Sequence, residues 1–294
     1  MIVITAYTQG WNAVFRNGRM WLALYLFNLL LALLAALPFS GYLSRTIGSS
    51  LAAEGSPGGF DYTLFNDWLR EYGQGLAPIL DASLGFLLLY LLLSVFLMGG
   101  ILLVFLQFAE PFRWGIFWRG CPRFFWRLLR LTVYFLLVQA AVLSLFGLLF
   151  YLTTGGFAIF EMETEMELVQ PLYYLLPVYL LVAVLVFMVQ DYAKIHVVQE
   201  DRKWLARPLR QAFGLVFRNF GSFFLLYLLN IATLLLLFGI YWWGSGPLSS
   251  AGSPALLFLW GQLFIFGRVG LRLLNLASAA YLYHRAVQHS GTEA

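Results

Sequence analysis

The chain has 294 residues, of which 61% are hydrophobic and only 11% are charged, and its formal net charge is +4. A mean hydropathy of +0.80 excludes a soluble globular domain, because a water-facing surface needs far more charge. A membrane-crossing helix takes about 20 mostly apolar residues, so six such helices use most of the length. The sequence therefore predicts a single all-α integral membrane domain over residues 1–294, with no soluble catalytic domain.

Six long apolar segments are the predicted transmembrane spans. We expect the first to end at Pro38, because proline interrupts a helix. We do not interpret it as a cleaved signal peptide, because it is rich in aromatic residues and lacks a small-x-small cleavage site. In chain order the spans are 21–37, 79–107, 129–153, 172–198, 222–243 and 255–283.

Basic residues are distributed unevenly over the connecting segments. Arginines are concentrated in the segments before the first, third and fifth spans. The alternate segments contain only two arginines, Arg45 and Arg70, but they contain most of the carboxylates. Lys and Arg in short loops mark the cytoplasmic side, so the pattern predicts that both termini are cytoplasmic. The opposite side carries an acidic run, which we interpret as a solvated loop rather than a metal site. This run comprises Glu161, Glu163, Glu165 and Glu167.

Several connecting segments have the pattern of amphipathic helices at the membrane surface. In residues 112–126 aromatic residues alternate with arginines, which suits a helix whose rings sink to head-group depth while its guanidiniums meet phosphates. Residues 203–217 and 8–15 have related patterns, and residues 64–72 predict a short outer helix. The partners expected at the inner face are anionic lipids, not nucleic acid. The predicted lipid head-group face comprises Arg113, Arg119, Arg123, Arg127, Arg130, Arg207 and Arg210.

An internal repeat relates the beginning of the chain to its last third. The segment Val-Phe-Arg-Asn occurs at 14–17 and at 216–219, and each copy is followed at the same distance by Leu-Tyr-Leu and an asparagine. Residues 125–127 resemble a third copy. Such units in the same orientation occur in some transporters, and twofold and threefold repeats both remain open. Mitochondrial carriers also have three helix pairs, but the Pro-x-acidic-x-x-basic signature of that family is absent here.

Polar side chains inside predicted spans are the candidate functional residues, because they are costly in a bilayer. Arg268, Arg272 and Asn275 fall within about 60° of one helical face, so we expect that stripe to face protein rather than lipid. Asp191 lies at a similar depth to Arg272, roughly 26–28 Å from the outer ends of their spans. A structural ion pair between them and an anion site at Arg268 are alternative interpretations. Asn28, Gln139 and Asn230 are expected to form hydrogen bonds between helices.

Sequence signatures of catalysis are missing. The three histidines form no His-x-x-x-His motif, there is no Gly-rich phosphate loop, and Cys121 has no second cysteine to pair with. We therefore predict no enzyme activity, no metal and no cofactor. The one enzymatic alternative is chemistry on a lipid head group with Asp191 as the base.

Three segments carry a family resemblance: Phe-Trp-Arg-Gly at 117–120 with Phe-Trp-Arg-Leu-Leu-Arg-Leu at 125–131, Gln-Asp-Tyr-Ala-Lys at 190–194, and Phe-Arg-Asn at 217–219. On these segments the chain resembles bacterial six-helix membrane proteins of unknown function, similar to the membrane domain that accompanies some glycerophosphodiester phosphodiesterases. The resemblance implies a bacterial inner-membrane location and no catalytic residues. The phosphodiesterase barrel is absent, so that activity does not transfer.

Two functions are compatible with this sequence. The first is a non-enzymatic accessory or membrane-organising factor that binds lipids or other membrane proteins through its helices and basic inner face. The alternative is a small transporter or channel for an anionic solute, with its site near Arg268 and Arg272.

Overall fold

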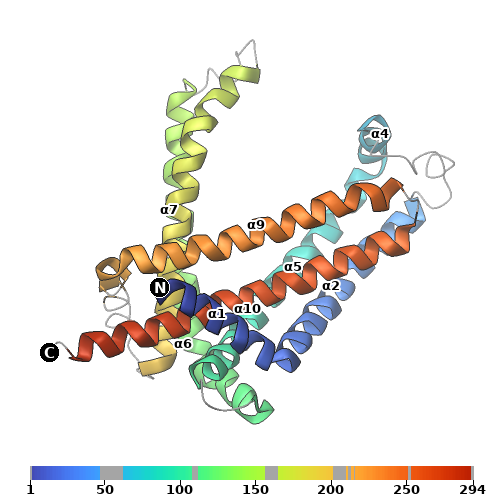
Figure 1. Ribbon diagram of the computed structural model, residues 1–294. Helices are drawn as coiled ribbons and strands as arrows, with labels where there is room; N and C mark the ends of the chain where they lie inside the picture. The colour runs from blue at the N-terminus through green and yellow to red at the C-terminus, as the bar shows by residue number, and fades with distance from the viewer. Residues whose placement is uncertain are drawn as a thin grey trace. The chain divides into compact units, whose positions relative to one another are not determined.

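The computed structural model describes residues 2–46, 62–107, 112–155, 165–200, 210, 213–214, 216–250 and 253–292, which are almost entirely helical and contain no strand (Figure 1). Six helices are long and apolar enough to cross a membrane. They are α2 (Gly18–Thr46), α5 (Ala77–Leu106), α6 (Trp114–Thr153), α7 (Glu165–Glu200), α9 (Phe220–Ser250) and α10 (Pro254–Thr292). The described chain also forms α1 (Ile2–Arg16), α4 (Tyr62–Tyr72) and a short 3₁₀ helix, η1 (Gly73–Leu76). The predicted all-α membrane fold with six spanning helices is confirmed.

The helices are longer than the predicted spans. The prediction that Pro38 ends the first span is wrong, because α2 continues through it to Thr46. Proline removes one backbone donor, but membrane helices tolerate it where neighbouring groups compensate. Pro122 and Pro177 likewise lie inside α6 and α7. Hydropathy marks only the apolar part of each helix, so it underestimates the full length.

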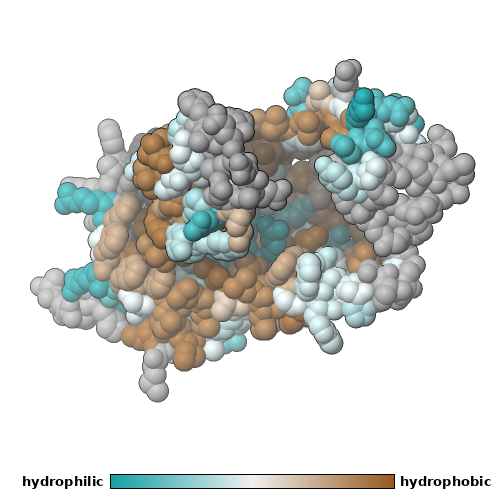
Figure 2. All heavy atoms as spheres, turned by 90° about the horizontal axis from the view of Figure 1, so that it is seen from above, coloured by the Kyte–Doolittle hydropathy of each residue, from teal (hydrophilic) through white to brown (hydrophobic). Residues whose placement is uncertain are grey.

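Large apolar side chains lie on the outside of the spanning helices. Leu88, Leu137 and Leu236 are each more than 60% exposed, and hydrophobic residues cover much of the surface visible in Figure 2. In water such a surface would drive aggregation, whereas in a bilayer it contacts acyl chains at no cost. Apolar side chains on the outside of the helices are what a multi-pass membrane protein requires.

The chain divides into two compact units, one of Met1–Trp21 with Val95–Ala294 and one of Leu22–Ser94. In the first unit, α9 runs beside α10 and α6 beside α7, and α1 packs on α10 (Figure 1). In the second unit, the hydroxyl of Tyr42 near the end of α2 donates a hydrogen bond to the carbonyl of Tyr72 at the end of α4.

Small residues allow α1 to approach α10 closely. Ala6, Gly10 and Ala13 lie on the buried face of α1. A Cβ at Gly10 would lie 2.8 Å from Cβ of Ser278 and 3.1 Å from its backbone nitrogen, closer than non-bonded atoms approach. This is the small-residue packing typical of membrane helices. The predicted helix over 8–15 is therefore present, and one of its faces is packed on α10.

The two Val-Phe-Arg-Asn segments adopt the same local geometry. Asn17 breaks the helix between α1 and α2, and its carbonyl accepts from the backbone N–H groups of Met20 and Trp21. Asn219 breaks the helix before α9, and its carbonyl accepts from Ser222 and Phe223 at the same spacing. Residues 125–127, the third copy, lie inside the uninterrupted helix α6.

The remaining predicted surface segments have different outcomes. Residues 112–126 are helical from Trp114 but continue into the span without a break. The short helix predicted over residues 64–72 is present as α4. Most of 203–217, including Arg207, and residues 161–164 of the acidic run lie outside the described residues.

Candidate functional site

Polar side chains of α7, α9 and α10 form one hydrogen-bonded network. Asn275 on α10 donates from Nδ2 to Oδ2 of Asp191 on α7 over 2.9 Å, and its Oδ1 accepts from Nδ2 of Asn230 on α9 over 3.1 Å. The second carboxylate oxygen of Asp191 lies 3.0 Å from Nζ of Lys194, one turn along α7. The side chains of Asp191 and Lys194 keep only 16% and 12% of their surface exposed. The network therefore joins three helices around a nearly buried, charge-balanced pair.

The predicted pair of Asp191 with Arg272 is wrong. The two oxygens of Asp191 bind Lys194 and Asn275, and the structure shows no ion pair between Asp191 and Arg272, both of which it describes. Arg268 and Arg272 are exposed. The packed face of α10 instead carries Gly270 and Ala277, about half a turn away from these arginines, and Ser278, roughly 80–120° away from them. Asn275 lies at one edge of the predicted polar stripe, and unlike the two arginines it contacts α7.

Two amides in the spans form the predicted contacts between helices. Asn230 binds Asn275 as described above, and Nε2 of Gln139 on α6 donates to the carbonyl of Ala183 on α7 over 3.3 Å. For Asn28 the contact stays a prediction. These bonds are of the kind that fixes how membrane helices pack, each contributing about 0.6 kcal/mol.

Further polar contacts surround the network. Tyr7 on α1 lies 2.9 Å from Oγ1 of Thr233 on α9. Because the Thr233 hydroxyl donates its proton to the carbonyl of Leu229, Tyr7 is the donor in this bond. Nδ1 of His196 on α7 contacts the hydroxyl of Tyr283 on α10. Sequence reasoning missed Lys194 and Tyr283 as partners, although the spacing of Asp191 and Lys194 along one helix was a usable signal.

The first part of α6 carries arginines and tryptophans on one side and a buried surface on the other. Phe117, Cys121 and Phe124 are buried, whereas Trp118 and Trp126 are 53% and 65% exposed. At 100° per residue, the helical arginines and Trp126 fall within roughly a 100° arc. The guanidiniums of Arg123 and Arg127 lie 5.6 and 5.8 Å from the ring centre of Phe124. We call this surface the Arg–Trp face; it comprises Arg119, Arg123, Trp126, Arg127 and Arg130 in this arc, together with Trp118, which flanks the arc about 80° from Trp126.

Glycines fix the first part of α6 against α5. A Cβ at Gly120 would lie 2.8 Å from the carbonyl oxygen of Gly99 and 2.9 Å from Cα of Gly100. Backbones approach this closely only where both helices lack side chains. Gly99 and Gly100 lie about 10 Å from the end of α5 at Leu106, counted at 1.5 Å per residue. The Arg–Trp face therefore begins about 10 Å along α5 from the end of that spanning helix.

Among the described residues, no group of three or more His, Cys, Asp or Glu side chains could hold a metal ion. Comparison with protein-family models, with curated proteins and with solved structures finds no match.

Proposed function

We propose that this chain is a non-enzymatic multi-pass protein of a bacterial inner membrane, which binds anionic lipid head groups at its cytoplasmic face and acts as an accessory or membrane-organising factor for lipids or partner proteins. The observation that carries the proposal is the Arg–Trp face of α6. Exposed tryptophans suit the head-group layer, where an apolar ring and an N–H group are both accommodated. The neighbouring guanidiniums match phosphates in geometry and charge.

The charge distribution supports the proposed orientation. Arg119, Arg123 and Arg130 lie at the beginning of α6, and Arg285 lies near the end of α10. If both helix ends are cytoplasmic, these arginines meet the anionic leaflet, where each basic residue near the surface contributes about 1 kcal/mol. The reverse orientation would place them where Lys and Arg are disfavoured in short loops.

The same topology accommodates the proposed repeat. The matching helix breaks at Asn17 and Asn219 support two related units. The continuous helix through residues 125–127 gives the third copy less support. We therefore propose a twofold repeat with α6 and α7 as a divergent middle unit.

Asp191 supports a structural role for the polar network rather than a catalytic one. Each carboxylate oxygen has a partner, one in Lys194 and one in Asn275. A general base for lipid chemistry must reach a substrate proton directly or through water, and these bonds instead hold the carboxylate between helices. Transport of an anion also gains less support, because Arg268 and Arg272 are exposed, and the partners of Asp191 are Lys194 and Asn275 instead.

The test is lipid enrichment around the protein in nanodiscs that contain phosphatidylcholine and an anionic phospholipid. The double variant Arg123→Gln/Arg130→Gln removes two charges from the Arg–Trp face. We expect it to lose the enrichment of anionic lipid, with about 2 kcal/mol of attraction removed in total. The double variant Arg45→Gln/Arg70→Gln makes the same charge change at the opposite face and should behave as the wild type. Equal enrichment in the two double variants would refute the proposal.

A liposome flux assay addresses transport. The proposal predicts no specific anion flux above that of empty liposomes. Saturable flux that disappears in Arg268→Ala, with folding intact, would favour the transporter instead.

A further inference from the structure

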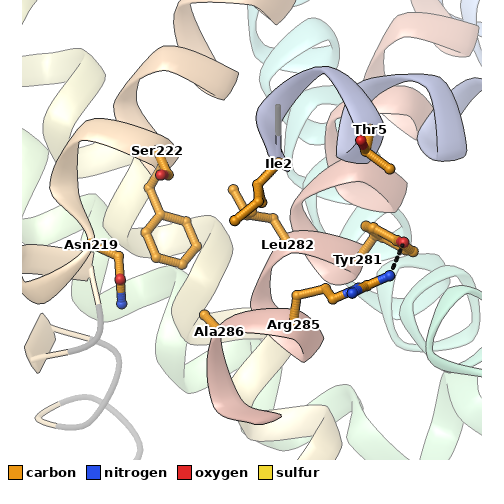
Figure 3. A pocket seen from close by; sticks show the side chains of 9 residues that line it. Ile2, Thr5, Asn219, Ser222, Tyr281, Leu282, Arg285 and Ala286 are labelled. Atoms are coloured by element: carbon orange, nitrogen blue, oxygen red, sulfur yellow. Dashed lines mark hydrogen bonds between the residues drawn. The ribbon is translucent and has the colours of Figure 1, made fainter. Parts of the chain in front are cut away.

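A cavity of about 330 Å³ lies where α1, α9 and α10 meet. Figure 3 shows residues that line it: Asn219 just before α9, Ser222 of α9, Ile2 and Thr5 of α1, and Arg285 of α10. Ligand pockets in proteins begin at about 300 Å³. The cavity therefore has room for a head group with a short length of acyl chain, but not for a whole lipid.

The walls of the cavity combine apolar and polar groups. Ile2, Phe223, Leu282 and Ala286 contribute apolar surface. Phe223 and Leu282 are almost completely buried, at 0% and 3% exposure, so this wall is fixed by the helix packing. An apolar surface beside polar side chains is the lining that an amphiphile requires.

Arg285 provides the charge. Its Nη2 donates to the hydroxyl of Tyr281 over 3.2 Å, and the guanidinium lies 5.7 Å from the centre of the same ring (Figure 3). These two contacts hold a side chain that would otherwise sample many rotamers. A guanidinium held in this way is prepared for a phosphate, which it binds through parallel N–H groups.

The depth of the cavity matches the head-group layer. Tyr281 follows Pro254 by 27 residues, about 41 Å along α10. The hydrocarbon core is about 30 Å thick, and the whole bilayer with its head groups is about 40–45 Å. In the proposed orientation the cavity therefore lies at the cytoplasmic surface, where lipid phosphates are found.

We propose that this cavity binds one phosphate-bearing amphiphile, with its phosphate at Arg285 and its apolar part against Ile2 and Ala286. The proposal rests on the proposed function for its membrane orientation, and it adds a specific site on helices other than α6. It predicts a stoichiometry of one, whereas the Arg–Trp face attracts a loose shell of lipid.

The test is native mass spectrometry of the purified full-length chain in detergent, titrated with short-chain phosphatidylglycerol. We expect one bound lipid per protein, and at least a tenfold weaker affinity in Arg285→Gln. Ala286→Phe fills the cavity without changing the charge, and it should lose binding to the same extent. Arg45→Gln changes the same charge outside the cavity and should bind as the wild type. The midpoint of unfolding in dodecyl sulfate confirms that each variant is folded.

Titrations with two other ligands show which part of the lipid is recognised. Glycerol phosphate carries the anion without the chain, and phosphatidylcholine of equal chain length carries a zwitterion. Binding of either as tightly as phosphatidylglycerol would overturn the assignment, as would unchanged affinity in Arg285→Gln or in Ala286→Phe. A different result would refute the proposed function, namely unchanged enrichment of anionic lipid around the Arg123→Gln/Arg130→Gln variant in nanodiscs.

Discussion

The contact between Gly120 and α5 determines where the Arg–Trp face lies, and a single methyl group should disturb it. In Gly120→Ala the new Cβ would lie 2.9 Å from Cα of Gly100, whereas carbon atoms in contact are about 3.5–4.0 Å apart. The two backbones must therefore separate by roughly 0.6–1.1 Å. Neither helix has a side chain at this point that could rotate away, so the backbones themselves must move.

Insertion of extra volume into a packed contact costs about 1–3 kcal/mol, and we expect Gly120→Ala to lower the free energy of unfolding by that amount. The assay is reversible unfolding in mixed micelles of dodecyl sulfate. Gly147→Ala is the matched control on the same helix, because a Cβ there meets no atom within 4 Å. The control should unfold at the wild-type midpoint or slightly above it, since Ala favours helix by up to about 1 kcal/mol. If Gly120→Ala and Gly147→Ala unfold at the same midpoint, the close approach of α5 and α6 does not exist.

Two further predictions use the same unfolding assay. Asn275→Ala leaves Oδ2 of the charged Asp191 without its donor and should cost about 1–3 kcal/mol. Asn230→Ala removes only contacts between neutral groups, to Asn275 over 3.1 Å and to Ser278 over 3.5 Å, and should cost about 0.6 kcal/mol. Equal costs would contradict the network. Trp21→Phe keeps a ring that stacks on Phe266 at 4.4 Å but loses the 2.9 Å hydrogen bond from Nε1 to the Phe266 carbonyl, and should cost about 0.5–1.5 kcal/mol. No loss of stability in Trp21→Phe would show that this hydrogen bond does not hold Trp21 against α10.

The sequence predicts the number of spans because an apolar run longer than a bilayer is a strong signal. Helix lengths are harder to predict from hydropathy. The first part of α6 contains arginines, which lower the hydropathy but are compatible with a helix. Pro38 shows the same limit, because a missing backbone donor does not end a helix that its neighbours support.

The partner of Asp191 could not be predicted from depth alone. Residue counting gives the height of a side chain along its helix but not the direction in which the helix turns it. Arg272 lies at a similar depth along its helix to Asp191, but its side chain is on the exposed face of α10. The packed face of α10 is the one with the small residues Gly270, Ala277 and Ser278. The glycines of α5 and α6 carried a usable signal, since adjacent glycines in an apolar helix favour close backbone contact.

Cysteine labelling from each side of the membrane tests most directly whether α6 crosses the bilayer with its Arg–Trp face in the cytoplasm. Cys121 is fully buried, so the wild type supplies an unlabelled background. Arg119→Cys and Thr153→Cys place exposed thiols near the two ends of α6. A membrane-impermeant maleimide should label Thr153→Cys in intact cells and Arg119→Cys only in inverted vesicles. Labelling of both positions from the same side would contradict the topology on which both proposals rest.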